Sequence, residues 1–165
     1  MNEADVERIV RDAVVRAKAE NKSVLTKQEI TLHAAEAVIK RVFAAAKEMG
    51  LNAIAAVADS GANIVAVMRM DGAITASYDI ACSKAYTSAS LKMSTEKLSK
   101  LAAPGGELYG IQETNGGRIV IFGGGEPLTY GGNVVGALGV SGGTLKQDTE
   151  LALIGKKYWE DIICR

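Results

Sequence analysis

The feature that most constrains this 165-residue chain is a glycine-rich segment at 116–143, with the sequence GGRIVIFGGGEPLTYGGNVVGALGVSGG. It holds eleven of the chain's 18 glycines and three short runs that suit strands, at 119–122, 127–130 and 134–140. We interpret the segment as a sheet meander. Gly136 and Gly139 fall inside the last run, where glycine weakens a strand. They therefore indicate the close approach of another backbone or of a ligand.

Three consecutive glycines, Gly123, Gly124 and Gly125, form a distinct feature of this segment. Their N–H groups carry no side-chain cover, and each residue can adopt a positive φ. Such a run can cradle an anion or admit a flat cofactor, and it can equally form a β-bulge that turns a strand. The residue types alone favour the bulge.

The N-terminal part of the chain predicts helices followed by a hairpin. Residues 1–20 place apolar side chains on one stripe with acidic and basic residues opposite, as in an amphipathic helix, and the polar segment 21–28 follows as a linker. A second helix is expected from Thr31 as N-cap to Met49, with Gly50 ending it. Residues 53–59 and 64–70, joined by a turn, predict a β-hairpin.

The remaining elements complete an α+β pattern. Helices are expected near 77–89, from Ser94 to 101, and after Thr144, which forms a capping box with Gln147. Strands grouped in hairpins, without strict alternation with helices, favour an antiparallel sheet flanked by helices. The hairpin and the three late runs together predict a sheet of five strands.

Composition narrows the classes of function. Acidic and basic residues balance at 19 each, so no overall field draws the chain to nucleic acid or to an anionic membrane. No apolar run reaches membrane-spanning length. Two cysteines without a CxxC spacing and an N-terminus without an apolar signal core predict a cytoplasmic protein.

Three side chains stand out as candidates for chemistry. His33 is the only histidine and falls on the polar face of its helix, where it is either solvated or a ligand of haem iron. Arg69 is followed closely by Asp71, either as a structural ion pair or as an arginine that holds a carboxylate or propionate in a pocket. Lys84 is either solvated or an anion contact facing the glycine-rich strands.

The motifs of several enzyme classes are absent from the sequence. No GxGxxG opens a helix after a strand, and no GxxxxGK[ST] occurs. The GVSGG run at 139–143 lacks the spacing of a nucleophile elbow, and there is no His/Cys cluster that suits zinc. No catalytic constellation is recognisable, so the residue types favour a protein that is not an enzyme.

From about residue 30 to 156 the chain resembles the GlcG/HbpS family, which includes the C-terminal domain of PduO-type cobalamin adenosyltransferases. The resemblance is carried, in order, by ADSGAN at 58–63, RMDGA at 69–73, SKA at 83–85, PGGELYGIQ at 104–112, FGGGEP at 122–127 and GALGVSGG at 136–143. It implies a profilin-like sheet with helices on its faces, in a domain over 28–165 that follows the helix and linker of 1–27.

The resemblance also implies a homo-oligomer and, for some members, binding of haem or a corrinoid. In that interpretation the flat cofactor rests on Gly123, Gly124 and Gly125, while Arg69, Lys84 or Arg118 contacts the propionates and His33, a methionine or a tyrosine is the axial ligand. The protein would be an accessory in a diol, glycerol or glycolate pathway. Adenosyl transfer is not implied, because the domain that performs it is missing.

An N-terminal amphipathic helix followed by a linker resembles the encapsulation peptides of bacterial microcompartments. We therefore expect residues 1–20 either to dock on the core or to bind a shell or cargo protein. Two other functions stay open: an enzyme for a small metabolite, using Asp59, Arg69, Asp71 and Lys84, and a ligand-free oligomeric scaffold whose glycines serve subunit packing.

Overall fold

A computed structural model describes residues 5–12 and 27–163 of the chain. Residues 5–12 are helical, and Val6, Ile9 and Val10 are each about half exposed. The remainder of the helix expected over 1–20, and most of the expected linker, lie outside the described residues. The main body has the order α2 (Leu32–Glu48), β1 (Ile54–Asp59), β2 (Ile64–Arg69), α3 (Ser77–Leu91), α4 (Thr95–Leu101), η1 (Ile111–Glu113), η2 (Asn115–Gly117), β3 (Gly125–Tyr130), β4 (Asn133–Ser141), α5 (Leu145–Tyr158) and η3 (Trp159–Ile163).

The helix ends follow the capping chemistry of the sequence. The Thr31 side chain accepts from the Ala34 N–H at the start of α2, and Gly50 takes a φ of 67° just after its end. Ser94 caps α4 through the Lys97 N–H. Thr144 and Gln147 form the expected capping box at the start of α5. These predicted helix starts are confirmed.

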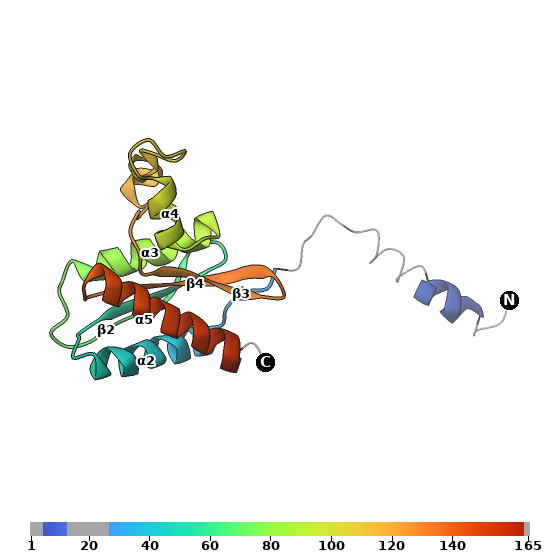
Figure 1. The fold of residues 1–165 in the computed structure, drawn as a ribbon. Helices are drawn as coiled ribbons and strands as arrows, with labels where there is room; N and C mark the ends of the chain where they lie inside the picture. Colours follow the sequence, from blue (N-terminus) through green and yellow to red (C-terminus); the bar gives the residue numbers. More distant parts are fainter. Residues whose placement is uncertain (1–4, 13–26, 164–165) are drawn as a thin grey trace.

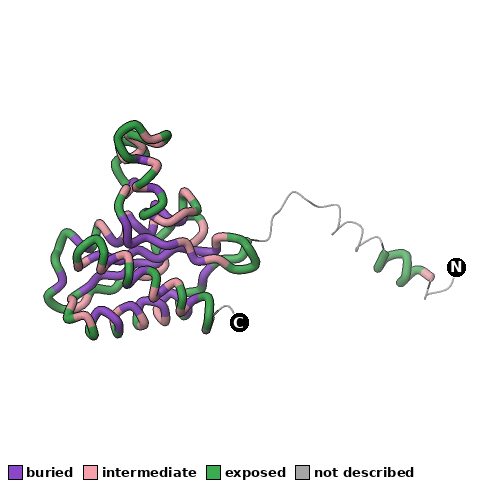
Figure 2. Tube along the Cα trace, in the orientation of Figure 1, coloured by how far each residue is buried: buried purple, intermediate pink, exposed green. Residues whose placement is uncertain are grey.

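The strands form one antiparallel sheet in the order β2-β1-β4-β3. Figure 1 shows α2 and α5 along one face of this sheet and α3 along the other, while α4 and the turns that follow it project away from the body. Side chains alternate between two cores: Ala55 and Val57 of β1 pack toward α2 and α5, and Ile54 and Ala56 pack toward α3. The central strands β1 and β4 are therefore buried on both faces, as Figure 2 shows.

The expected five strands are wrong by one, because the described sheet has four. The run Ile119–Phe122 forms no ladder. Its backbone lies against α3, where the Val120 N–H donates to Thr87 Oγ1 over 2.9 Å. A side-chain hydroxyl thus takes the place of a neighbouring strand, so a run with strand composition remains irregular.

Candidate functional site

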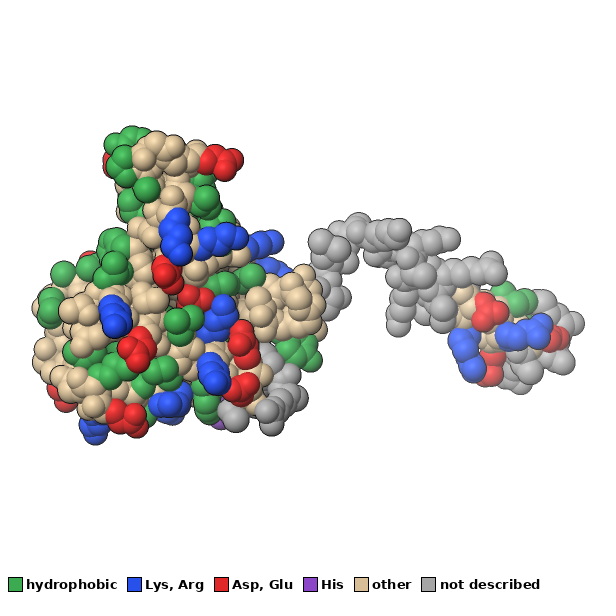
Figure 3. Space-filling model, viewed as in Figure 1, with side chains coloured by type: hydrophobic (Ala, Val, Ile, Leu, Met, Phe, Trp, Pro, Cys, Tyr) green, Lys and Arg blue, Asp and Glu red, His purple; other side chains and the backbone are tan. Residues whose placement is uncertain are grey.

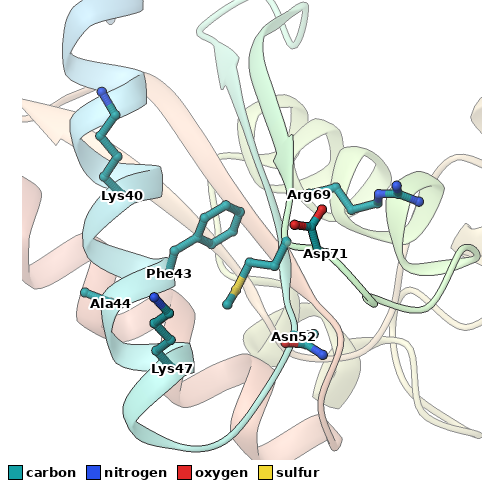
Figure 4. Close-up of a pocket in the computed structure, with 8 residues that line it drawn as sticks. Lys40, Phe43, Ala44, Lys47, Asn52, Arg69 and Asp71 are labelled. Carbon is teal, nitrogen blue, oxygen red and sulfur yellow. The ribbon is translucent and has the colours of Figure 1, made fainter.

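A pocket of about 620 Å³ lies between α2 and the end of β2. Figure 4 shows Phe43 and the neighbouring sulfur-bearing side chain between the two elements, with Lys40 and Lys47 rising from α2 and Arg69 extending from β2 away from that helix. The volume falls in the range of small-molecule sites. The complete lining consists of Lys40, Phe43, Ala44, Lys47, Asn52, Arg69, Met70 and Asp71. An apolar floor flanked by the two lysines of α2 suits a flat apolar ligand that carries carboxylates.

His33 lies on the same exposed row of α2 as this pocket. Positions 33, 40 and 47 are seven residues apart, so they share one face of the helix, and His33 is about 10.5 Å along the axis from Lys40. The imidazole is exposed. Glu36 lies between His33 and Lys40 along the chain, and its Oε2 is 3.5 Å from Lys40 Nζ. The structure therefore places His33 on the helix face that borders the pocket but outside the pocket's lining, while the Arg69 side chain points away from α2.

Arg69 and Asp71 do not form the structural ion pair that the sequence allowed. Neither side chain has an ion partner within 4 Å among the residues that the structure describes, and both line the pocket. Arg69 ends β2, where it lies opposite Ile54 of β1. Its exposed guanidinium is thus available to meet a carboxylate from outside the chain.

Lys84 is not solvated, and its side chain faces the glycine-rich strands. It is fully buried, and its Nζ donates to Asp148 Oδ2 over 2.7 Å and to the Val140 carbonyl over 2.8 Å. The same ammonium lies 5.2 Å from the centre of the Phe122 ring. Lys84 belongs to α3 and Asp148 to α5, so the pair links helices from opposite faces of the sheet.

The Lys84–Asp148 pair is satisfied within the chain. Burial lowers the pKa of Lys84, and the hydrogen bond and charge of Asp148 oppose that change. Asp148 Oδ1 also accepts from the Gly143 N–H over 2.9 Å. Since both ends of the pair are occupied by the protein's own atoms, Lys84 is not an open anion contact in this structure.

The glycines expected to receive a flat guest are covered by the protein itself. A Cβ at Gly124 would lie 2.7 Å from Lys84 Nζ, and one at Gly125 would lie 2.7 Å from Ser88 Oγ. At Gly123 it would collide with Thr149, and at Gly139 it would collide with the backbone of α3. The close approach inferred for Gly136 and Gly139 is confirmed, but both neighbours belong to the same chain: Ala58 of β1 and Ile30 at Gly136, and α3 at Gly139. The backbone turns at Gly124, with a φ of 107°, into β3.

Arg118 lies apart from the pocket at α2. Its guanidinium carbon is 3.7 Å from the centre of the Tyr86 ring, and Tyr86 belongs to α3 on the other face of the sheet. The Tyr86 hydroxyl also accepts from Asn115 Nδ2 over 3.0 Å. The predicted site residues are therefore divided: His33 lies on α2, Arg69 lies at the end of β2 and points away from α2, and Lys84, Arg118 and the triple glycine lie near α3.

The residues proposed for a small-metabolite enzyme are not assembled. Asp59 ends β1 at the opposite end from Ile54, the partner of Arg69, so the two sites are separated by about 17 Å of strand. The Asp59 carboxylate accepts from the Gly61 and Asn63 N–H groups of the hairpin turn. With Lys84 buried, these groups do not converge on one reacting atom. Among the described residues there is also no cluster of three His, Cys, Asp or Glu that suits a metal ion.

Two features of the site are visible only in the folded chain. The first is the set of pocket residues on α2: nothing in the sequence distinguishes Lys40, Phe43 and Lys47 from ordinary helix residues. The seven-residue spacing of the two lysines with His33 does indicate that these three share one face of the helix. The sequence does not identify Asp148 as the partner of Lys84. Its place in the first turn of a capped helix offers a weak hint, but the pairing joins positions 64 residues apart.

Comparison with known proteins agrees with the fold and with the resemblance. The family model described as "Haem degrading protein HbpS-like" matches residues 30–156, so the chain belongs to this HbpS-like family. A curated relative from Citrobacter freundii, named "Uncharacterized 15.0 kDa protein in dhaT-dhaS intergenic region", is 46% identical over 74% of this chain and 87% of its own length. The corrinoid adenosyltransferase PduO of Salmonella typhimurium is 34% identical over 65% of this chain, which spans only 32% of that protein.

Solved structures give the same result. The Klebsiella pneumoniae protein ORFY matches with a TM-score of 0.82 and 40% identity, over 86% of this chain and 97% of that one. A structure described as a complex of PduOC with haem matches with a TM-score of 0.75 and 29% identity, over 78% of this chain and 94% of that one. In the described part of the present chain, no helix has the length and apolarity needed to cross a membrane.

Proposed function

We propose that this protein is an accessory haem-binding protein that holds its cofactor in the pocket between α2 and β2, with a corrinoid as the second candidate ligand. The observation that carries the proposal is the pocket's combination of Phe43 and Met70 with Lys40 and Lys47. Haem offers an apolar macrocycle and two propionates to such a lining. The haem complex of the related PduOC and the name of the relative PduO support the choice of ligand.

In this proposal each side chain has a physical task. Phe43 and Met70 would contact the macrocycle, and Lys40 and Lys47 would contact its carboxylates. His33, on the same face of α2, would hold the iron through its imidazole. The bound iron would supply redox chemistry. Arg118, Lys84 and the triple glycine take no part, because they lie near α3 or are buried.

Spectroscopic titration of the full chain tests the proposal. When haemin is added to the purified protein, its Soret band is expected to shift, and the change is expected to saturate at one haemin per site. Lys40→Gln with Lys47→Gln is expected to weaken binding at least tenfold, while Lys100→Gln on α4, away from the pocket, leaves it unchanged. Loss of the shifted band in His33→Ala, with retained binding, identifies the axial ligand. Absence of any spectral change with haemin or cobalamin would rule the function out.

We also propose that residues 1–27 form a separate targeting segment and that 28–165 form the ligand-binding domain, within a homo-oligomer. The family match begins at residue 30, and the exposed side chains of Val6, Ile9 and Val10 form an apolar stripe on helix 5–12. Such a stripe suits a groove of a microcompartment shell or cargo protein. Ile9→Glu with Val10→Glu is expected to abolish co-purification with shells, whereas Glu7→Gln preserves it. Unchanged co-purification of the double variant would contradict the targeting role.

A further inference from the structure

A second pocket, of about 380 Å³, lies beside α3, on the opposite face of the sheet from α2. Its walls are the first half of α3 and the irregular backbone that leads into β3. The volume falls in the range of small-molecule sites. Four large apolar side chains contribute to the lining: Ile80, Ile119, Ile121 and Phe122.

Three polar side chains, Asp79, Ser83 and Gln112, also line this pocket. None of the three has a hydrogen bond or an ion pair to another side chain or to the backbone within the described part of the chain. Gln112 Oε1 is buried, and a buried acceptor without a donor is rare because it has lost its water. A donor on a bound molecule would remove that cost.

The charge around the pocket is negative. Among the described residues of the lining, Asp79 is the only charged one. Arg118 lies outside the lining, and the buried Lys84 is neutralised by Asp148. Burial raises the pKa of the Cys82 thiol on α3, and the charge of Asp79 raises it further, by more than Arg118 lowers it. The field beside this part of α3 therefore favours a cation.

We propose that this pocket binds a small primary ammonium ion that carries an apolar body, with Asp79 as the counter-ion. A primary ammonium has three N–H donors, and the lining offers three acceptors without partners. Asp79 and Ser83 lie one turn apart on the same face of α3, so they can share one ammonium group. The Gln112 amide, whose last torsion is soft, turns its buried oxygen toward the guest. The isoleucines and Phe122 cover the apolar body.

A nuclear magnetic resonance titration of the full chain with three ring compounds of similar shape tests the site. Benzylamine, benzyl alcohol and benzoate carry a positive, a neutral and a negative group. Benzylamine is expected to bind at least tenfold more tightly than the other two and to shift the signals of Ser83 and of the Gln112 side-chain amide. Equal binding of the alcohol, tighter binding of benzoate, or no binding of benzylamine would overturn the proposal.

Variants of the two acidic and amide groups locate the contact. Asp79→Asn is expected to weaken benzylamine binding at least tenfold and to remove its advantage over benzyl alcohol. Glu107→Gln, which neutralises an exposed carboxylate outside the lining, is the matched control and is expected to bind as wild type. Far-UV circular dichroism checks that each variant is folded. Benzylamine binding that Asp79→Asn leaves unchanged would contradict the assignment.

Gln112→Leu separates a ligand contact from a structural role. Leucine has no unpartnered oxygen to bury, so the folded protein is expected to be at least as stable in urea, while benzylamine binding weakens. A loss of stability with unchanged binding would show that Gln112 is structural, which contradicts its role as an acceptor. Lys40→Gln with Lys47→Gln, in the pocket at α2, is expected to leave benzylamine binding unchanged, so this test is independent of the haemin titration.

Discussion

Lys84 Nζ lies 2.7 Å from Asp148 Oδ2, and this buried ion pair joins α3 on one face of the sheet to α5 on the other. Removing one partner leaves the other charge buried without compensation, which costs about 3–5 kcal/mol. Lys84→Met is therefore expected to lower the free energy of unfolding by that amount in urea titrations.

The second partner provides the discriminating variant. Lys84→Met combined with Asp148→Asn removes both charges and keeps an acceptor for the Gly143 N–H, so we expect much of the stability to return. Lys40→Met, which breaks only the exposed pair with Glu36, is expected to change stability by less than about 1 kcal/mol. Equal losses in the single and double variants would contradict a role based on charge compensation.

Gly139 has no room for a side chain, because α3 crosses it closely. A methyl group there would lie 2.5 Å from the Ala85 nitrogen and collide with the Ala81 carbonyl. Gly139→Ala is expected to lower the free energy of unfolding by at least about 1–3 kcal/mol, since helix and sheet must separate. Gly61→Ala is the control. The atoms nearest to the added methyl group there belong to side chains, which can move, so a smaller loss of stability is expected. A Gly139→Ala variant with wild-type thermal stability would show that this contact is not tight.

Thr95 protects the start of β3 through one hydrogen bond. Thr95→Val preserves shape but leaves the Gly125 N–H without an acceptor in a buried position. We expect a loss of about 1–3 kcal/mol and faster hydrogen exchange at Gly125. Ser99→Ala, on the exposed side of α4, serves as the control. Unaltered exchange at Gly125 would mean that water replaces the hydroxyl.

Glu126 predicts a pH effect of defined sign. Burial raises the pKa of Glu126 above its ordinary value of 4.5, and Lys156, 3.0 Å away, opposes the change. The folded protein thus binds the proton more tightly than the unfolded chain, so this group's contribution to stability falls as pH rises from 4.5 through the higher folded pKa.

Glu126→Gln lacks this titration. Its stability relative to wild type is therefore expected to increase as pH rises through that window, measured by urea unfolding at a series of pH values. Glu36→Gln, which removes an exposed carboxylate, provides the comparison. A stability difference for Glu126→Gln that stays constant across the series would contradict the assignment.

The local features of the fold were predictable from short-range chemistry. Thr31, Ser94 and the Thr144–Gln147 pair cap the helices that their sequence positions indicated, because capping depends on residues only a turn apart. The strand predicted at 119–122 is wrong, because strand composition does not specify a strand partner. Figure 3 agrees with the balanced composition, since acidic and basic side chains are interspersed on the face it shows.

The candidate site was only partly predictable, because its contacts join residues that are far apart in the sequence. Arg69 is recognisable from its place at the end of a strand, and His33 from its rarity, but nothing in the sequence shows how either side chain lies relative to the pocket at α2. The glycines correctly indicated close contact, while the partner, α3, is separated from Gly139 by more than fifty positions. Burial of Lys84 depends on the same long-range packing and has no local sequence signal.

The outer edge of β3 sets a limit to association through the backbone. Its Gly125 N–H is bonded to Thr95, Pro127 has no N–H, and the Thr129 carbonyl accepts from Trp159. A strand of another molecule finds few backbone groups to pair with there, so the sheet resists, at this edge, the runaway polymerisation that leads to fibrils.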